Sequence, residues 1–341
     1  MTNTIVLSDA SLRDGNHAVR HQLTAQQIAS YARAADEAGI DIVEVGHGNG
    51  LGASSCLLGK ATSTDTEMLA AARANLRRSK LSVHFIPGFA KTTDIERALE
   101  VGVDVFRIAS HCTEANITRQ YIEHAKQAGK TAYGVLMMSH MADAAELLRQ
   151  SKLMQSYGAD AIVLMDSAGF STPGDVAEKV GRLVEHLSVA VGYHAHNNLG
   201  LAVANSIVAV QCGATMLDAC VRGFGAGAGN TQLEALVAVL ERYGYATRTD
   251  FARTAVLAKV TESFLPVRTP HIPIANITTG VYGLFSGFVP HIERLATELK
   301  IDAFELCARL AARKLVAGQE DTIVEEAHRL AAEMNVTRVA A

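Results

Sequence analysis

His194 and His196 are separated by one alanine at the end of an apolar run, YHAH. Residues two apart in a β-strand project to the same face, so both imidazoles would point to one side of a sheet. Asp14 directly follows Arg13 near the end of another apolar run. Two imidazoles and one carboxylate suit a six-coordinate divalent ion. We therefore predict a metal site made by Asp14, His194 and His196, with the other positions left to water or a chelating substrate.

Two further polar side chains lie close to Asp14 in the sequence. The guanidinium of Arg13 could hold an enolate or carboxylate oxygen beside the metal. A surface salt bridge is the ordinary alternative for Arg13, but the flanking Gly15 and a strand-end position favour the chemical role. His17 is the best candidate for a general base, because an imidazole titrates near neutral pH. Its alternative is a solvated loop histidine.

The elements that would position these residues are short apolar runs that alternate with longer helical stretches. Near-continuous apolar strands indicate a sheet covered on both faces, and hence parallel βα units. Eight units favour a closed (β/α)8 TIM barrel over an open doubly wound sheet. The predicted strands are residues 5–11, 42–47, 81–87, 105–110, 131–137, 161–167, 190–196 and 216–221.

A barrel explains how the candidate residues could meet, because active sites of this fold lie at the C-terminal ends of the strands. Closure brings the first strand, and with it Asp14, near the seventh strand and its two histidines. The glycine-rich run 223–230 follows the eighth strand. It could present N–H groups to an anion or be only a tight turn.

The pattern changes after Tyr243, where helical periodicity continues without a clear strand. We predict a catalytic barrel over residues 1–245 and a C-terminal helical domain over residues 246–341. The chain has 341 residues, is 49% apolar and carries a formal net charge of −4. No basic stripe indicates nucleic acid, and no apolar run approaches the roughly 20 residues that span a bilayer. We expect no signal peptide, reduced cysteines and a cytoplasmic location.

Stretches along nearly the whole chain resemble the 4-hydroxy-2-oxoacid aldolases, in the superfamily of 3-hydroxy-3-methylglutaryl-CoA lyase and isopropylmalate synthase. His17 separates the aldolases from the synthases, which usually have Glu-Gln after the glycine. The run 223–230 has no cysteine, unlike the corresponding loop of the CoA lyase. The similar stretches are LRDGNHAVRHQLT (12–24), VEVGHGNGLGASS (43–55), MDSAG (165–169), HAHNNLGLAVANS (194–206), GAGAGNTQLEAL (225–236) and KLVAGQED (314–321).

The resemblance implies a role for each matching residue. Asp14, His194 and His196 would bind the metal, usually Mn²⁺, with Co²⁺ or Mg²⁺ as alternatives. Arg13 would stabilise an enolate and His17 would act as the base. Substrate would contact Arg13, His194 and Ser167. Members commonly work with an acylating aldehyde dehydrogenase, and we also expect a homo-oligomer.

Two stretches depart from the family pattern. The family has a tail tyrosine that reaches the active site, in a Gly-Val-Tyr-Ser-Ser-Phe-like stretch. Here residues 280–288 read GVYGLFSGF, so the motif points to Tyr282 and the ungapped match points to Phe285. In the second stretch, HFIPG replaces Leu-Leu-Leu-Pro-Gly, which places His84 and Ile86 on the aldehyde side and makes that pocket more polar.

The predicted reaction is metal-dependent cleavage of a 4-hydroxy-2-oxoacid to pyruvate and an aldehyde. No lysine lies within a predicted strand, which disfavours an imine mechanism and favours the metal. One alternative is an acyl-CoA Claisen enzyme or CoA-ester lyase on the same scaffold. Another is a binding partner of a dehydrogenase with weakened catalysis, which the intact metal and base residues disfavour.

Overall fold

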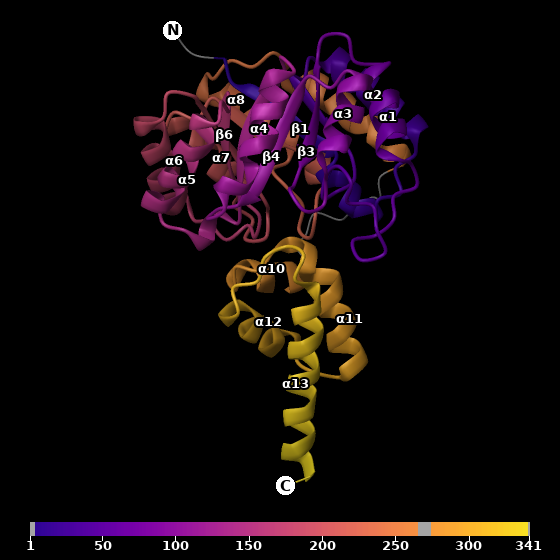
Figure 1. Cartoon of the computed structure of the whole chain (residues 1–341), viewed down its shortest axis with the longest axis vertical. Helices are drawn as coiled ribbons and strands as arrows, with labels where there is room; N and C mark the ends of the chain where they lie inside the picture. Colours follow the sequence, from indigo (N-terminus) through magenta and orange to yellow (C-terminus); the bar gives the residue numbers. More distant parts are fainter. Residues whose placement is uncertain (1–3, 265–273, 340–341) are drawn as a thin grey trace.

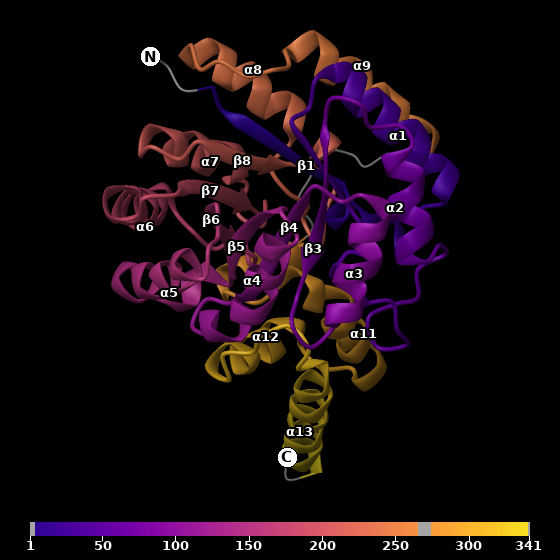
Figure 2. The same ribbon diagram turned by 45° about the horizontal axis from the view of Figure 1, so that its top comes forward.

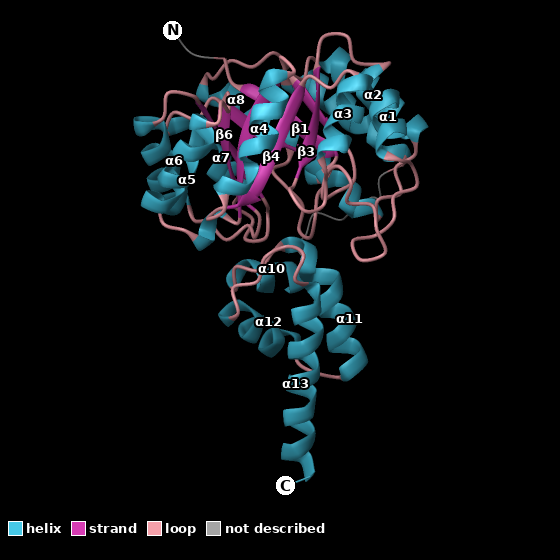
Figure 3. Cartoon of the chain, in the orientation of Figure 1, coloured by secondary structure: helices cyan, strands magenta, loops and turns pink. Residues whose placement is uncertain are grey.

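The computed structural model describes residues 4–264 and 274–339, and it confirms the predicted TIM barrel. Eight parallel strands close in chain order, with β8 pairing with β1. Strands lie among helices in the upper part of the view, and the C-terminal helices lie below it (Figure 1, Figure 3). The predicted runs match the strands to within a few residues. The strands are β1 (Val6–Leu12), β2 (Ile42–Val45), β3 (Lys80–Phe85), β4 (Val105–His111), β5 (Thr131–Met137), β6 (Ala161–Asp166), β7 (Ala190–Ala195) and β8 (Met216–Ala219).

Eight helices surround the strands and cover the outer face of the barrel (Figure 2). Several begin with a capping box, in which a threonine and the residue three positions later satisfy each other's free backbone N–H groups. Thr24 with Gln27 and Thr172 with Asp175 are two of these. The helices are α1 (Ala25–Ala38), α2 (Asp65–Arg73), α3 (Thr92–Val101), α4 (Arg119–Gln127), α5 (Ala144–Ser156), α6 (Pro173–His186), α7 (Ala202–Gln211) and α8 (Leu233–Tyr243).

The barrel interior has an apolar layer beneath a charged layer. Residues from different strands, including Ile42, Val105 and Met216, form one small buried cluster, which only the inside of the barrel can bring together. Residues two positions further along a strand face the same way. Glu44, Arg107 and Asp218 stand two positions after those three, so they form the layer above, nearer the C-terminal end of the barrel.

The C-terminal part is helical, as predicted. Helix α9 (Phe251–Val260), which the sequence prediction placed in the second domain, packs on α1 and α8, and Leu257 belongs to the barrel's main hydrophobic core. The later helices have their own core around Phe288 and Leu306. They are α10 (Ile274–Val281), α11 (Val289–Leu299), α12 (Ala303–Ala312) and α13 (Glu320–Val339), and α13 runs away from the barrel (Figure 1). No helix within the described ranges is long and apolar enough to cross a membrane.

The C-terminal domain contacts the barrel where β6 and β7 end. The Asn198 side chain donates to the Asn276 carbonyl oxygen at 2.9 Å and accepts from the Ser286 hydroxyl at 3.0 Å. The Ser286 N–H donates to the carbonyl oxygen of Ser167 at 3.3 Å. A Cβ on Gly227 would lie 2.9 Å from the Ser286 Cβ, so the close approach requires glycine there. The second domain therefore borders the end of the barrel that carries the site.

Candidate metal centre

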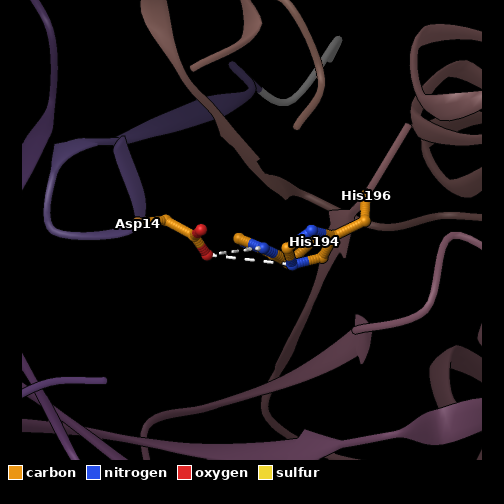
Figure 4. A group of neighbouring side chains, drawn as sticks. All are labelled: Asp14, His194 and His196. Atoms are coloured by element: carbon orange, nitrogen blue, oxygen red, sulfur yellow. Dashed lines mark ion pairs between the residues drawn. The ribbon is translucent and has the colours of Figure 1, made fainter. Parts of the chain in front are cut away.

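The predicted metal ligands come together at the C-terminal end of the barrel (Figure 4). Asp14 opens a 3₁₀ turn just after β1, His194 lies in β7, and His196 follows that strand directly. One donor atom from each lies within 4.8 Å of the others. The Asp14 Oδ2 atom is 3.6 Å from His194 Nε2 and 3.8 Å from His196 Nε2. Among residues 4–264 and 274–339, this is the one such group of three or more potential ligands.

The charge states of the three side chains suit a cation. Although burial opposes ionisation, the guanidinium of Arg13 holds the pKa of Asp14 well below its usual range. Burial lowers the pKa of His196 to about 3, so its imidazole is neutral at pH 7. A carboxylate and a neutral imidazole are the ligand forms that bind a metal without losing a proton first.

The orientation of His194 is set by its second ring nitrogen. His194 Nδ1 lies 2.9 Å from Asp218 Oδ2, a carboxylate from the neighbouring strand β8. A hydrogen bond there places the proton on Nδ1 and leaves the Nε2 lone pair directed toward Asp14. Although burial opposes protonation, hydrogen bonds with Asp14 and Asp218 raise the pKa of His194. Protonation of His194 would add a second proton, at Nε2, and a cation bound at Nε2 would compete with that proton.

Two buried polar atoms near these ligands have no hydrogen-bond partner, namely His196 Nδ1 and Asn230 Oδ1. Asn230 Nδ2 lies 3.3 Å from His194 Nε2, so the amide borders the ligand set. Unpaired buried polar atoms are costly unless something binds them. The atoms that face one another across the site are Nε2 of both histidines and Oδ2 of Asp14, and these donors suit a divalent ion bound through nitrogen and oxygen.

Arg13 is buried beside the ligand set. Its Nη1 donates to Asp14 Oδ2 at 2.7 Å and to the carbonyl oxygen of Gly48 at 3.3 Å. Its Nε lies 3.3 Å from Glu44 Oε1. Arg13 therefore forms buried salt bridges, not a surface salt bridge. The carboxylates of Asp14 and Glu44 hold its guanidinium at the barrel mouth.

His17 follows Asp14 in the same 3₁₀ turn and is partly exposed. Its ring packs edge-on to that of His21, with centroids 4.9 Å apart. Any Cβ on Gly48 would lie only 2.4 Å from the His17 ring, so glycine at this position permits the approach. Loss of solvent lowers the pKa of His17, which favours the neutral form that can accept a proton.

The predicted pocket residues lie in different surroundings. Ser167 Oγ accepts from the Met138 N–H at 3.0 Å at the end of β6. His84 is buried in the barrel, with Nδ1 3.3 Å from Glu44 Oε1, and burial lowers its pKa to about 4. Ile86 is partly buried and packs against apolar residues inside the barrel.

The two candidates for the tail aromatic residue both pack against the core of the C-terminal domain. Tyr282 lies after α10, and its N–H donates to the Thr278 carbonyl oxygen at 3.1 Å. Phe285 directly precedes Ser286, whose N–H reaches Ser167. Gly283, next to Tyr282, also contacts the barrel, because its carbonyl oxygen lies 2.8 Å from His140 Nε2. Both candidates therefore have a neighbouring residue in contact with the loops at the barrel mouth.

Sequence reasoning missed Glu44, Arg107, Asp218 and Asn230. The first three stand inside apolar strand runs, where a single charged residue gives no local motif. A usable signal existed, because a charged residue within a buried strand must find a partner inside the fold.

Comparison with known proteins gives two family matches. The HMGL-like family model matches residues 4–261, and the DmpG-like communication domain matches residues 270–332. A 4-hydroxy-2-oxovalerate aldolase of Burkholderia pseudomallei (strain K96243) is 65% identical over 98% of this chain and 96% of its own length. One from Pectobacterium atrosepticum is 51% identical over 97% of each chain. The carboxyl transferase domain of Rhizobium etli pyruvate carboxylase shares the fold, with a TM-score of 0.82 at 16% identity over 97% of this chain and 61% of that one.

Proposed function

The chain belongs to the HMGL-like family, with a DmpG-like communication domain after its barrel, and from this membership we propose that it is a metal-dependent aldolase. Its reaction would cleave a 4-hydroxy-2-oxoacid to pyruvate and an aldehyde. The supporting observation is that Arg13, Asp14 and His17 share one turn that faces His194 and His196 at the barrel mouth. Relatives at 65% and 51% identity carry the name 4-hydroxy-2-oxovalerate aldolase.

A divalent ion held by Asp14, His194 and His196 would polarise the 2-keto oxygen, which contributes several kcal/mol to catalysis. The His17 imidazole accepts the proton of the substrate's 4-hydroxyl group. The C4 oxygen then forms the aldehyde carbonyl while the C3–C4 bond breaks, and its electron pair passes into the pyruvate enolate. The Arg13 guanidinium stabilises the enolate oxygen. The proton that His17 accepted then returns, through solvent, to C3, which completes pyruvate and restores the neutral imidazole.

The substrate contacts that we propose beyond this set are Ser167 on the 2-oxoacid and His84 with Ile86 on the aldehyde side. For the tail aromatic residue we keep Tyr282 as the motif match. Phe285 is the alternative from the ungapped match, and both stretches contact the barrel mouth, through Gly283 with His140 and through Ser286 with Ser167.

The function is tested by a pyruvate-release assay on a panel of 4-hydroxy-2-oxoacids. The protein is first stripped with a chelator, and Mn²⁺, Co²⁺ or Mg²⁺ is then returned separately. We expect one pyruvate for each aldehyde, and only after a metal is returned, with Mn²⁺ as our proposed ion. Acetyl-CoA with a 2-oxoacid serves as the control for Claisen chemistry. Absence of pyruvate from every member of the panel, or thiol release in the control, would contradict the aldolase.

The pH dependence should report His17. Because its pKa is lowered from 6.5, the neutral base persists below that pH, and kcat/KM should fall only as His17 becomes protonated at lower values. His17→Gln should lose this acid limb and reduce kcat by about 10²–10⁴, the usual contribution of a general base. The measurement is kcat/KM against pH for both proteins with metal in excess. An unchanged acid limb in the variant would assign it to another group.

We propose that an acylating aldehyde dehydrogenase is the partner of this protein. The support is the match of residues 270–332 to a communication domain and the position of this domain at the barrel mouth, where the aldehyde would leave. Co-expression with such a dehydrogenase should yield a complex in size-exclusion chromatography. If the two proteins elute separately at micromolar concentration, this partner is wrong.

A further inference from the structure

Arg107 in β4 is the largest fully buried side chain among the described residues, with 0% of its surface exposed. Arginine stays charged in proteins, so a buried guanidinium needs anionic partners. It lies inside the barrel in the charged layer above the apolar cluster. Neither the proposed chemistry nor the predicted ligands account for it.

Two carboxylates from other strands and one hydroxyl surround Arg107. Both terminal nitrogens donate to Asp218: Nη1 reaches Oδ1 at 2.8 Å and Nη2 forms a short contact with Oδ2. Nη1 also donates to Ser8 Oγ at 2.9 Å and lies 3.6 Å from Glu44 Oε2. The bidentate pairing defines the plane and rotation of the Asp218 carboxylate.

Each carboxylate also holds one member of the proposed site. Asp218 Oδ2 lies 2.9 Å from His194 Nδ1, which directs Nε2 toward the metal position. Glu44 lies 3.3 Å from Arg13 Nε and 3.4 Å from Arg13 Nη2. Arg107 is therefore the shared cation between the carboxylate that orients a metal ligand and the carboxylate that holds the enolate-stabilising arginine.

We propose that Arg107 is a positioning residue that orients His194 through Asp218 and Arg13 through Glu44. A lysine in its place would keep the charge but offer no planar pair of N–H groups to Asp218. The carboxylate could then rotate, and the His194 ring would lose its defined orientation. The effect on Arg13 rests on the proposed function, whereas the effect on metal binding does not.

The test is Arg107→Lys, compared with wild type by calorimetric titration with Mn²⁺ and no substrate. We expect the metal Kd to rise by about 10–100-fold, as when outer partners of metal-binding histidines are removed. At saturating Mn²⁺, kcat should still be reduced and KM should change less, because Arg13 acts in the transition state. The matched control is Arg73→Lys, which alters an ion pair with Asp104 at the other end of the strands and should leave Kd unchanged.

If the Arg107→Lys protein does not fold, the variant Asp218→Asn tests the same proposal by the same measurement. This near-isosteric variant should raise the Mn²⁺ Kd in the same direction, and combining the two should raise it by less than the product of the single effects, since both act through one carboxylate. A purely structural Arg107 would lower the melting temperature and leave Kd within about threefold of wild type, which would overturn the proposal. Wild type that binds Mn²⁺ but releases no pyruvate would refute the proposed function alone.

Discussion

Asp14→Ala should lose bound metal and reduce turnover by roughly 10³-fold or more. The Lewis-acid contribution is several kcal/mol, and each 1.36 kcal/mol corresponds to a factor of ten. Asp14 is the one carboxylate in the ligand set, so its removal leaves two imidazoles to hold the ion. It also takes away the 2.7 Å partner of Arg13. The measurements are metal content after dialysis and kcat with Mn²⁺ returned in excess.

The matched control is Asp160→Ala. Asp160 precedes β6 at the opposite end of the barrel, where it pairs with Lys126 at 2.7 Å on a partly exposed surface. Exposed ion pairs contribute little to stability, so this variant should retain its metal and its activity. If Asp14→Ala kept a full complement of tightly bound Mn²⁺, the assignment of the ligand set would fail.

Arg13→Ala should reduce kcat by about 10²–10³-fold while Mn²⁺ stays bound, the size of effect found when one oxyanion donor is removed. The physical reason is that negative charge develops on the enolate oxygen as the C3–C4 bond breaks. Arg13→Lys should recover only part of the loss, because a lysine cannot contact Asp14 and Glu44 through a planar fork. The measurement is kcat and KM at saturating Mn²⁺, with metal content determined on the same samples.

Metal retention separates this variant from Asp14→Ala. Removing Arg13 also leaves Glu44 with one arginine partner fewer, so some loss of thermal stability is expected. Turnover close to wild type in a fully metal-loaded Arg13→Ala protein would show that another group stabilises the enolate.

The metal ligands could be predicted from the sequence because their signal is local. Two histidines at strand spacing and an aspartate after a strand identify a site once the barrel is recognised. Arg107 and Asp218 lack such a signal, since each stands alone within an apolar run. Their meeting depends on the radius and closure of the barrel, which bring β4 and β8 face to face across its interior.

The tail could be predicted only as helical. Whether Tyr282 or Phe285 approaches the site depends on how the second domain docks, and docking is a tertiary property that no local pattern encodes. In the structure the docking contacts include Ser286 with Asn198 and Ser167, and Gly283 with His140. The position of His84 also needed the fold, because the register of β3 against β2 pairs Glu44 with Ser82 and so places the His84 ring, two residues further along β3, beside Glu44.

The contacts of Asn198 have a consequence for the order in which the protein matures on the ribosome. Its amide is buried and finds its partners in Asn276, Thr279 and Ser286, which are synthesised after the barrel strands are complete. Domains generally fold as they emerge, at about 5–20 residues per second. A nascent barrel would therefore have the Asn198 amide open to water until residues 276–286 have been synthesised and have docked. Docking of α10 and Ser286 would then enclose the amide and complete this part of the rim, so the mouth of the barrel would mature after its strands.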